Sequence, residues 1–96
     1  MAIYVELIKT DKIEPDFVYY NYQFSIVVET YRNNAGKLRN KLKEVTGVIK
    51  INKQTGEIHV VELAEGDKGS HAQRAAAALM KHWKKGEFPD KTCWAS

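Results

Sequence analysis

The chain has 96 residues, of which 44% are hydrophobic and 28% charged, and its formal net charge is +3. This ordinary composition argues against a disordered or fibrous chain, and the length allows one domain, which we expect to span residues 1–96. No apolar run reaches the ~18 residues that a transmembrane helix needs, so we expect no membrane span.

The charged residues are segregated along the chain. Residues 32–53 hold seven Lys or Arg against one Glu, whereas residues 54–67 hold four acids and no Lys or Arg. Blocks of this kind can steer a charged partner, although a solvated mixed surface is the more common outcome.

The first elements expected are a strand and a loop. Ile3, Val5 and Leu7 alternate with polar or amphipathic residues, which predicts a strand over Ala2–Lys9. Thr10–Asp16 is polar and contains Pro15, which predicts a loop.

The next stretch carries two competing patterns. Even positions from Val18 to Thr30 are mostly apolar, as on one face of a long strand, while a stripe from Phe24 to Val45 steps by four and three as in a helix. The β-branched Ile26–Val28 favours a strand over 17–31. Leu38, Leu42 and Val45 share a helical face, so we interpret Lys37–Val45 as a short helix, and the assignment of 25–46 stays open between strand and helix.

Gly47–Leu63 predicts a β-hairpin. Ile49 and Ile51 alternate with polar residues, and Ile58 and Val60 follow a connection that ends at Gly56. Gly56 can adopt the left-handed conformation that closes such a turn.

The clearest helical pattern is Ser70–Lys85. Ser70 and Gln73 have the spacing of a capping box, an apolar stripe runs from Ala72 to Trp83, and Gly86 suits the residue that follows a helix. The tail Phe88–Trp94 is expected to fold back and bury its aromatic side chains. We therefore predict an α+β fold, a mainly antiparallel sheet of three or four strands with the C-terminal helix on one face.

Catalytic and metal-binding patterns are weak. Cys93, His82 and Asp90 contain the elements of a nucleophile, a base and an orienting group, but a tail position does not activate a thiol. His71 and His82 are eleven residues apart, about 16 Å along a helix, and cannot share an ion. We expect no enzyme activity, no cofactor and no metal. As the single cysteine, Cys93 also favours a reducing, cytoplasmic location.

Two binding functions remain. The basic segment 32–53 could neutralise phosphates while strand tyrosines stack on bases, but no RNA-binding motif is present and the acidic blocks would repel phosphate. Exposed aromatics beside charged groups are typical of protein interfaces. The candidate partner-binding residues are three aromatics and four acids: Tyr19, Phe88, Trp94, Glu57, Glu62, Glu65 and Asp67.

The C-terminal tract and the predicted hairpin resemble segments of a known protein family. Gln73–Ala76 (QRAA) and Lys81–Ser96 (KHWKKGEFPDKTCWAS), together with the hairpin Ile49–Ile58 (IKINKQTGEI), resemble small bacterial immunity proteins of contact-dependent growth-inhibition and other polymorphic toxin systems. The resemblance implies a non-enzymatic cytoplasmic protein that binds and neutralises a cognate toxin domain, often a nuclease. Residues 24–47 look like an addition to that pattern. A nucleic-acid-binding regulator that uses segment 32–53 is the alternative.

Overall fold

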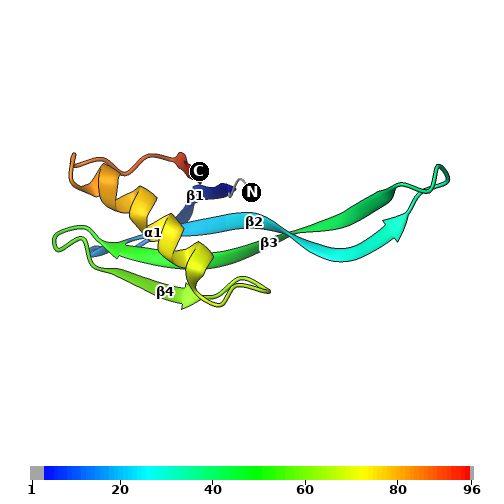
Figure 1. The fold of residues 1–96 in the computed structure, drawn as a ribbon. Coiled ribbons are helices and arrows are strands. Elements are labelled where there is room, and N and C mark those ends of the chain that lie inside the picture. The colour runs from blue at the N-terminus through cyan, green and yellow to red at the C-terminus, as the bar shows by residue number, and fades with distance from the viewer. Residues whose placement is uncertain (1–3, 96) are drawn as a thin grey trace.

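An antiparallel β-sheet with a helix against one face forms the body of the protein (Figure 1). The computed structural model describes residues 4–95. Within that range the elements are β1 (Tyr4–Ile13), β2 (Phe17–Arg32), β3 (Leu38–Asn52), β4 (Ile58–Glu62), α1 (Ser70–Trp83) and β5 (Lys91–Ala95). The strands are arranged in the order β4-β3-β2-β1-β5. The predicted α+β fold is confirmed, and the described residues form five strands rather than three or four.

The first strand is longer than the sequence indicates. It continues past Lys9 to Ile13, so the prediction of a loop from Thr10 is wrong for its first four residues. Pairing of Ile13 with Val18 of β2 extends the strand across an irregularity in register. Residues 2 and 3 of the expected strand lie outside the described residues.

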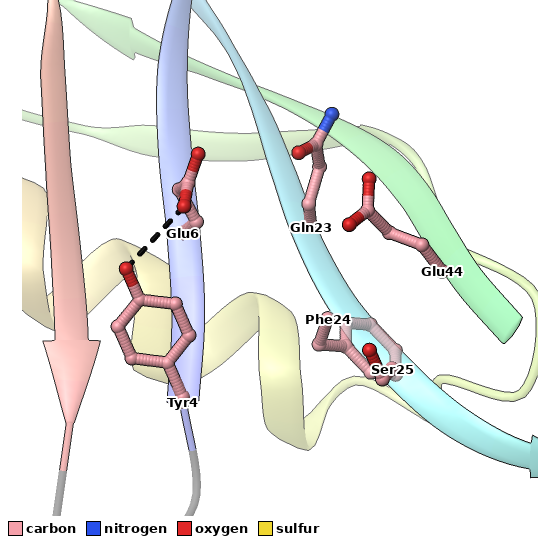
Figure 2. A pocket seen from close by; sticks show the side chains of 6 residues that line it. All are labelled: Tyr4, Glu6, Gln23, Phe24, Ser25 and Glu44. Carbon is pink, nitrogen blue, oxygen red and sulfur yellow. Dashed lines mark hydrogen bonds between the residues drawn. The ribbon is translucent and has the colours of Figure 1, made fainter. Parts of the chain in front are cut away.

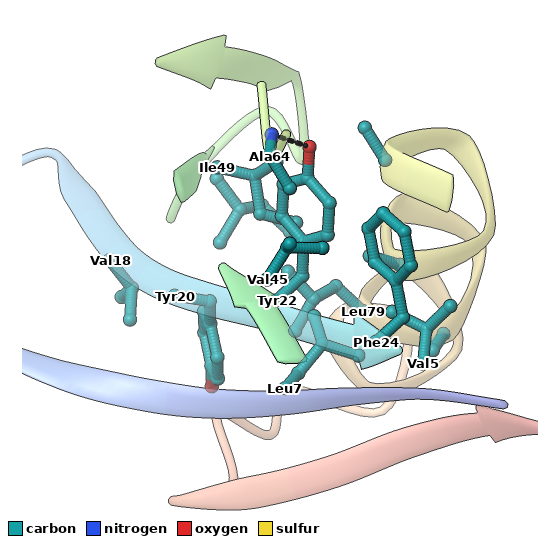
Figure 3. Close-up of a cluster of buried hydrophobic side chains, with 14 residues drawn as sticks. Val5, Leu7, Val18, Tyr20, Tyr22, Phe24, Val45, Ile49, Ala64 and Leu79 are labelled. Atoms are coloured by element: carbon teal, nitrogen blue, oxygen red, sulfur yellow. Dashed lines mark hydrogen bonds between the residues drawn. The ribbon is translucent and has the colours of Figure 1, made fainter. Parts of the chain in front are cut away.

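The core lies between the sheet and α1 (Figure 3). Even positions of β2 up to Ile26 face the helix side of the sheet, and Tyr20 and Tyr22 are completely buried there. Ala72, Ala75 and Ala78 bring α1 close to the sheet because they have almost no side chain to hold the backbones apart. The completely buried aliphatic residues each contribute about 1.5–3 kcal/mol through burial; they are Val5, Leu7, Ile49 and Ile51.

The tail folds back as predicted. β5 pairs with β1 from Ile8↔Lys91 to Tyr4↔Ala95, which makes β5 one edge of the sheet. The Tyr20 hydroxyl donates to the Pro89 carbonyl at 2.6 Å, which ties the segment before β5 to the core.

The turn of the 47–63 hairpin and the left-handed Gly86 agree with the sequence, whereas α1 ends at Trp83, two residues before the predicted Lys85. Gly56 has a φ of 76° and its N–H donates to the Asn52 carbonyl, as the closing residue of the predicted turn. Gly86 has a φ of 75° after the helix, and its N–H donates to the Trp83 carbonyl.

The start of α1 differs from the prediction. Ser70 and Gln73 do not form a capping box, because Gly69 is the N-cap residue and Ser70 is already the first helical residue. The free N–H groups of this first turn are instead satisfied from outside the helix by the Asp67 carboxylate.

The predicted helix over Lys37–Val45 is wrong. Lys37 lies in a turn, and Leu38–Val45 is the first half of β3, which pairs with residues 24–32 of β2 in a long hairpin. Asn33 closes the hairpin because its side-chain oxygen accepts from the N–H groups of Ala35 and Lys37. The 4–3 spacing of Leu38, Leu42 and Val45 is thus coincidental, since Val45 faces the core while Leu38 and Leu42 do not.

The outer part of this hairpin, residues 25–44, projects from the body and is called the arm below (Figure 1). Within residues 4–95, neither β1 nor β4 pairs with the arm, because the pairing of β1 with β2 ends at Gln23 and the pairing of β4 with β3 ends at Val48. The arm makes the molecule 55 Å long but only about 22 Å wide. The radius of gyration, 15.7 Å, accordingly exceeds the ~12.5 Å of a compact chain of this length.

Candidate protein-binding surfaces

Three of the predicted acidic residues lie together along one side of the sheet. Glu57 precedes β4, Glu62 ends it and Glu65 follows in the next loop, and all three are exposed. Glu57 contacts His59 at 3.2 Å, and Glu65 pairs with Lys43 of the arm at 2.7 Å. Glu62 forms no ion pair with any residue in 4–95.

Asp67 is the fourth predicted acid, and the structure removes it from the surface. Its side chain is completely buried and accepts hydrogen bonds from the Tyr22 hydroxyl at 2.7 Å and from the N–H groups of Gly69, His71 and Ala72. Burial by itself raises the pKa of Asp67, but these four donors outweigh it and lower the pKa below its ordinary value. Asp67 therefore anchors the helix and is not available to a partner.

Tyr19 also differs from its expected place on the surface. Its side chain is buried, with its hydroxyl donating to Glu14 at 2.8 Å and the Lys12 ammonium 4.3 Å from its ring centroid. The ring is therefore covered by neighbouring side chains and is not an exposed anchor.

Phe88 and Trp94 are half-buried and pack against the core. Arg74 of α1 lies 5.4 Å from the centre of the Trp94 ring, and this contact covers part of the aromatic surface. Both aromatics therefore hold the tail on the body, which leaves them only their outer edges for a partner.

Sequence reasoning missed the apolar residues beside the exposed acids. Val60, Val61 and Leu63 are each about half exposed. The pairing of β4 with β3 shifts register after Val60, so Val61 has no paired residue and the alternation of inward and outward side chains is broken. We call residues 57–63 the β4 edge, because β4 is the last strand on this side of the sheet. It combines apolar and acidic side chains with backbone groups that no described strand pairs.

The arm is the second surface that sequence reasoning missed. Its largest exposed apolar side chains come from both strands and are Val27, Val28, Tyr31, Leu38 and Leu42. It also gathers five of the seven cations of segment 32–53, namely Arg32, Lys37, Arg39, Lys41 and Lys43. The overlapping strand and helix patterns in 25–46 were the available signal, since alternation on both sides of Asn33-Asn34-Ala35-Gly36 describes a hairpin equally well.

The weak catalytic combination is not assembled. His82 Nε2 lies 2.9 Å from the Thr92 hydroxyl, which places the imidazole on the face of β5 that Thr92 shares. Cys93, the next residue along the strand, points to the opposite face, and Asp90 pairs with Lys9. Within residues 4–95, no cluster of three or more His, Cys, Asp or Glu side chains could hold a metal ion.

Three comparisons with known proteins give no relative. No protein-family model, curated protein or solved structure matches this chain. No helix among the described residues is long and apolar enough to cross a membrane.

Proposed function

We propose that this protein is an immunity protein that binds and neutralises a cognate toxin domain, a nuclease in our proposal, without catalysing a reaction. The observation that carries the proposal is the β4 edge, where the half-exposed Val60, Val61 and Leu63 lie beside the exposed acids Glu57 and Glu62. The resemblance of the closing tract to immunity proteins supports the same class of partner. We further propose that the protein acts in the cytoplasm.

The chemistry of the β4 edge suits such a partner. An unpaired strand edge offers N–H and C=O groups to an extended segment of another chain, and alternate side chains beside it supply specificity. A nuclease carries cations where it binds phosphates, so the glutamates would speed the encounter and occupy that surface. The apolar residues beside the glutamates would provide the desolvated centre that a tight interface needs.

The test is binding to the protein encoded beside this gene, together with rescue of growth when that protein is expressed. We expect Val61→Lys to weaken binding at least about 30-fold, because it places a charge in the apolar centre. Glu57→Lys with Glu62→Lys should slow association about tenfold at low salt and less at high salt. Both effects are measurable by surface plasmon resonance at two salt concentrations.

The matched control is Ile13→Lys. Ile13 is 94% exposed at the end of β1 and is separated from β4 by the strands β2 and β3, so the same kind of substitution there should leave binding and growth rescue unchanged. The proposal would be overturned if Ile13→Lys weakened binding as much as Val61→Lys does. It would also be overturned if the wild-type protein did not bind.

The arm favours a second candidate function, binding of nucleic acid. The major groove of duplex DNA, about 12 Å wide, admits a two-stranded β-ribbon, and the arm is such a ribbon with five cations. Affinity for a mixed-sequence DNA duplex would then fall log-linearly with salt, and Lys41→Glu would weaken it on every sequence. A pull-down from a cell lysate separates the two functions. A partner protein that stays bound after nuclease treatment and a high-salt wash would favour the toxin-binding function instead.

A further inference from the structure

The arm exposes several large apolar side chains to water. Leu38 and Leu42 are each more than 60% exposed and Val27 is 55% exposed. An isolated two-stranded hairpin is only marginally stable in water, and this one extends beyond the strands and helix that cover the rest of the sheet. A second surface that covers the arm would therefore stabilise it.

The register of the hairpin divides the arm into two different faces. Val45 points to the core, so the odd residues of β3 share the helix side of the sheet and the even residues share the other side. The helix-side face of the arm carries four charged side chains, Glu29, Arg39, Lys41 and Lys43, together with Ile26 and Tyr31. The opposite face, called the apolar face below, is formed by paired residues of β2 and β3: Ser25, Val27, Thr30, Arg32, Leu38, Asn40, Leu42 and Glu44.

The apolar face has a definite order along its length. At its base, Glu44 and Glu6 border a shallow depression of about 360 Å³, and Gln23 lies between them (Figure 2). Val27 and Leu42 are paired in the middle, beside the extra residue Val28 of the bulge. At the tip, Arg32 is paired with Leu38, and Lys37 lies in the turn next to them. Between the Val27–Leu42 pair and the tip lies the Thr30–Asn40 pair, in which the Thr30 hydroxyl donates to the Asn40 side-chain oxygen at 3.0 Å. The face is thus acidic at the base, apolar and then polar in the centre, and cationic at the tip.

One charged side chain at each end of this face forms no ion pair with another described residue. Glu6 already pairs with Lys91 at 3.3 Å, whereas Glu44 has no ion-pair partner within the described residues. Arg32 donates to the Gly36 carbonyl at 2.9 Å and likewise has no carboxylate partner there. Two opposite charges, about 23 Å apart by strand rise, therefore both remain available for contacts on the same face.

We propose that the occupant of this face is the same face of a second copy of the chain. When two arms pack face to face and antiparallel, the cationic tip of each lies over the acidic base of the other. A two-fold axis then passes between the Val27–Leu42 and Thr30–Asn40 pairs. Each dimer therefore contains two Arg32–Glu44 contacts, with the Val27–Leu42 pair of each copy buried beside the axis. Such an isologous contact is closed and stops at a dimer. The helix-side faces, with Arg39 and Lys41, point outward and repel further copies.

The choice of a second copy rests on charge complementarity. A duplex nucleic acid would match the cationic tip but would be repelled by Glu44 and Glu6 at the base, and it offers little to the exposed leucines. A partner that matches the whole face must be cationic where this face is acidic and acidic where it is cationic. The same face of a second copy, turned end to end, has this order of charges. The inference does not depend on the proposed toxin partner, which uses the β4 edge.

The experiment is the mass of the purified, nuclease-treated full chain by light scattering and sedimentation, from about 1 to 500 µM. We expect a monomer–dimer equilibrium for the wild-type protein. Leu42→Lys should raise the dimer dissociation constant at least about 100-fold, with an unchanged circular dichroism spectrum because Leu42 is exposed. Ile13→Lys is the matched control and should dimerise as the wild-type protein does.

A charge exchange tests the antiparallel arrangement itself. Arg32→Glu and Glu44→Arg should each weaken the dimer about tenfold, and the double variant should restore it, because each reversed charge again faces its opposite in the partner. The proposal would be overturned by a wild-type monomer at 500 µM, by a dimer that Leu42→Lys does not affect, or by failure of the double variant to recover. A species of higher mass that is present only before nuclease treatment, with a monomer remaining afterwards, would also overturn it and would assign the arm to nucleic acid.

Discussion

Replacement of Asp67 by Ala is expected to lower the free energy of unfolding by about 3–5 kcal/mol. The carboxylate accepts from the Tyr22 hydroxyl and from three N–H groups at the start of α1, and its side chain is completely buried. Its loss leaves several buried donors without an acceptor and removes the cap of the helix. Urea denaturation followed by circular dichroism gives the magnitude.

The control for this substitution is Glu65→Ala. Glu65 lies two residues earlier, is exposed and makes an ion pair with Lys43, so its loss should cost less than about 1 kcal/mol. Similar losses for the two variants would show that Asp67 does not have the anchoring role described above.

The same carboxylate predicts how stability depends on acid. Because the pKa of Asp67 is lowered in the folded protein, its contribution is present above the unfolded pKa, about 3.9, and is lost as the pH falls through the folded value. Burial raises the pKa of both Tyr20 and Tyr22 to about 12, so the tyrosines contribute fully below pH ~10 and lose that contribution as the pH rises toward 12. In Asp67→Ala, the free energy of unfolding should therefore fall less steeply at acid pH. Its decrease at alkaline pH should remain, because Tyr20 still contributes to it.

Gly47→Ala is expected to lower the free energy of unfolding by about 3 kcal/mol, from overpacking rather than loss of a contact. A Cβ on Gly47 would overlap the ring and hydroxyl of Tyr22, which lies beside it in the register of β2 and β3. The ring cannot easily move away, because its hydroxyl donates to Asp67 and accepts from the Ala64 N–H at 2.9 Å.

A double-mutant cycle separates this clash from a backbone effect. Tyr22→Leu is destabilising by itself, but in its background Gly47→Ala should cost less than about 1 kcal/mol because the overlapping atoms are gone. Gly36→Ala at the arm tip meets no atom within 4 Å and has a φ of 76°, so it should cost only the ~1–2 kcal/mol of a left-handed conformation. A cost for Gly47→Ala that persists with Leu at position 22 would rule out the overlap as its cause.

The parts of the fold that local patterns determine were predictable from the sequence. The stripe of α1, the alternation and Gly56 turn of the 47–63 hairpin, and Gly86 after the helix all depend on neighbouring residues, and the structure confirms them. The arm was not predictable in the same way, because the spacing of Leu38 and Leu42 fits both a helix and one face of a strand. This segment is a strand because it pairs with the β-branched stretch of β2, and no local pattern reveals that pairing.

The candidate site was predicted only in part, for a similar reason. The acids at positions 57, 62 and 65 are exposed as expected, but Asp67 in the same acidic block is buried. A short loop with two glycines and a lysine is typical of a solvated link, and only the position of Tyr22, 45 residues away, turns the aspartate inward. The exposure of Val61 likewise follows from a register shift that the sequence does not indicate.

The contact between Tyr22 and Asp67 also has a consequence for local opening of the chain. A helix usually frays from its first turn, where amide hydrogens exchange with solvent through small fluctuations. Here the amides of His71 and Ala72 donate to a carboxylate that is bonded to the centre of the sheet. Their exchange therefore requires the sheet to open as well, so the beginning of α1 belongs to the most protected cooperative unit of the protein.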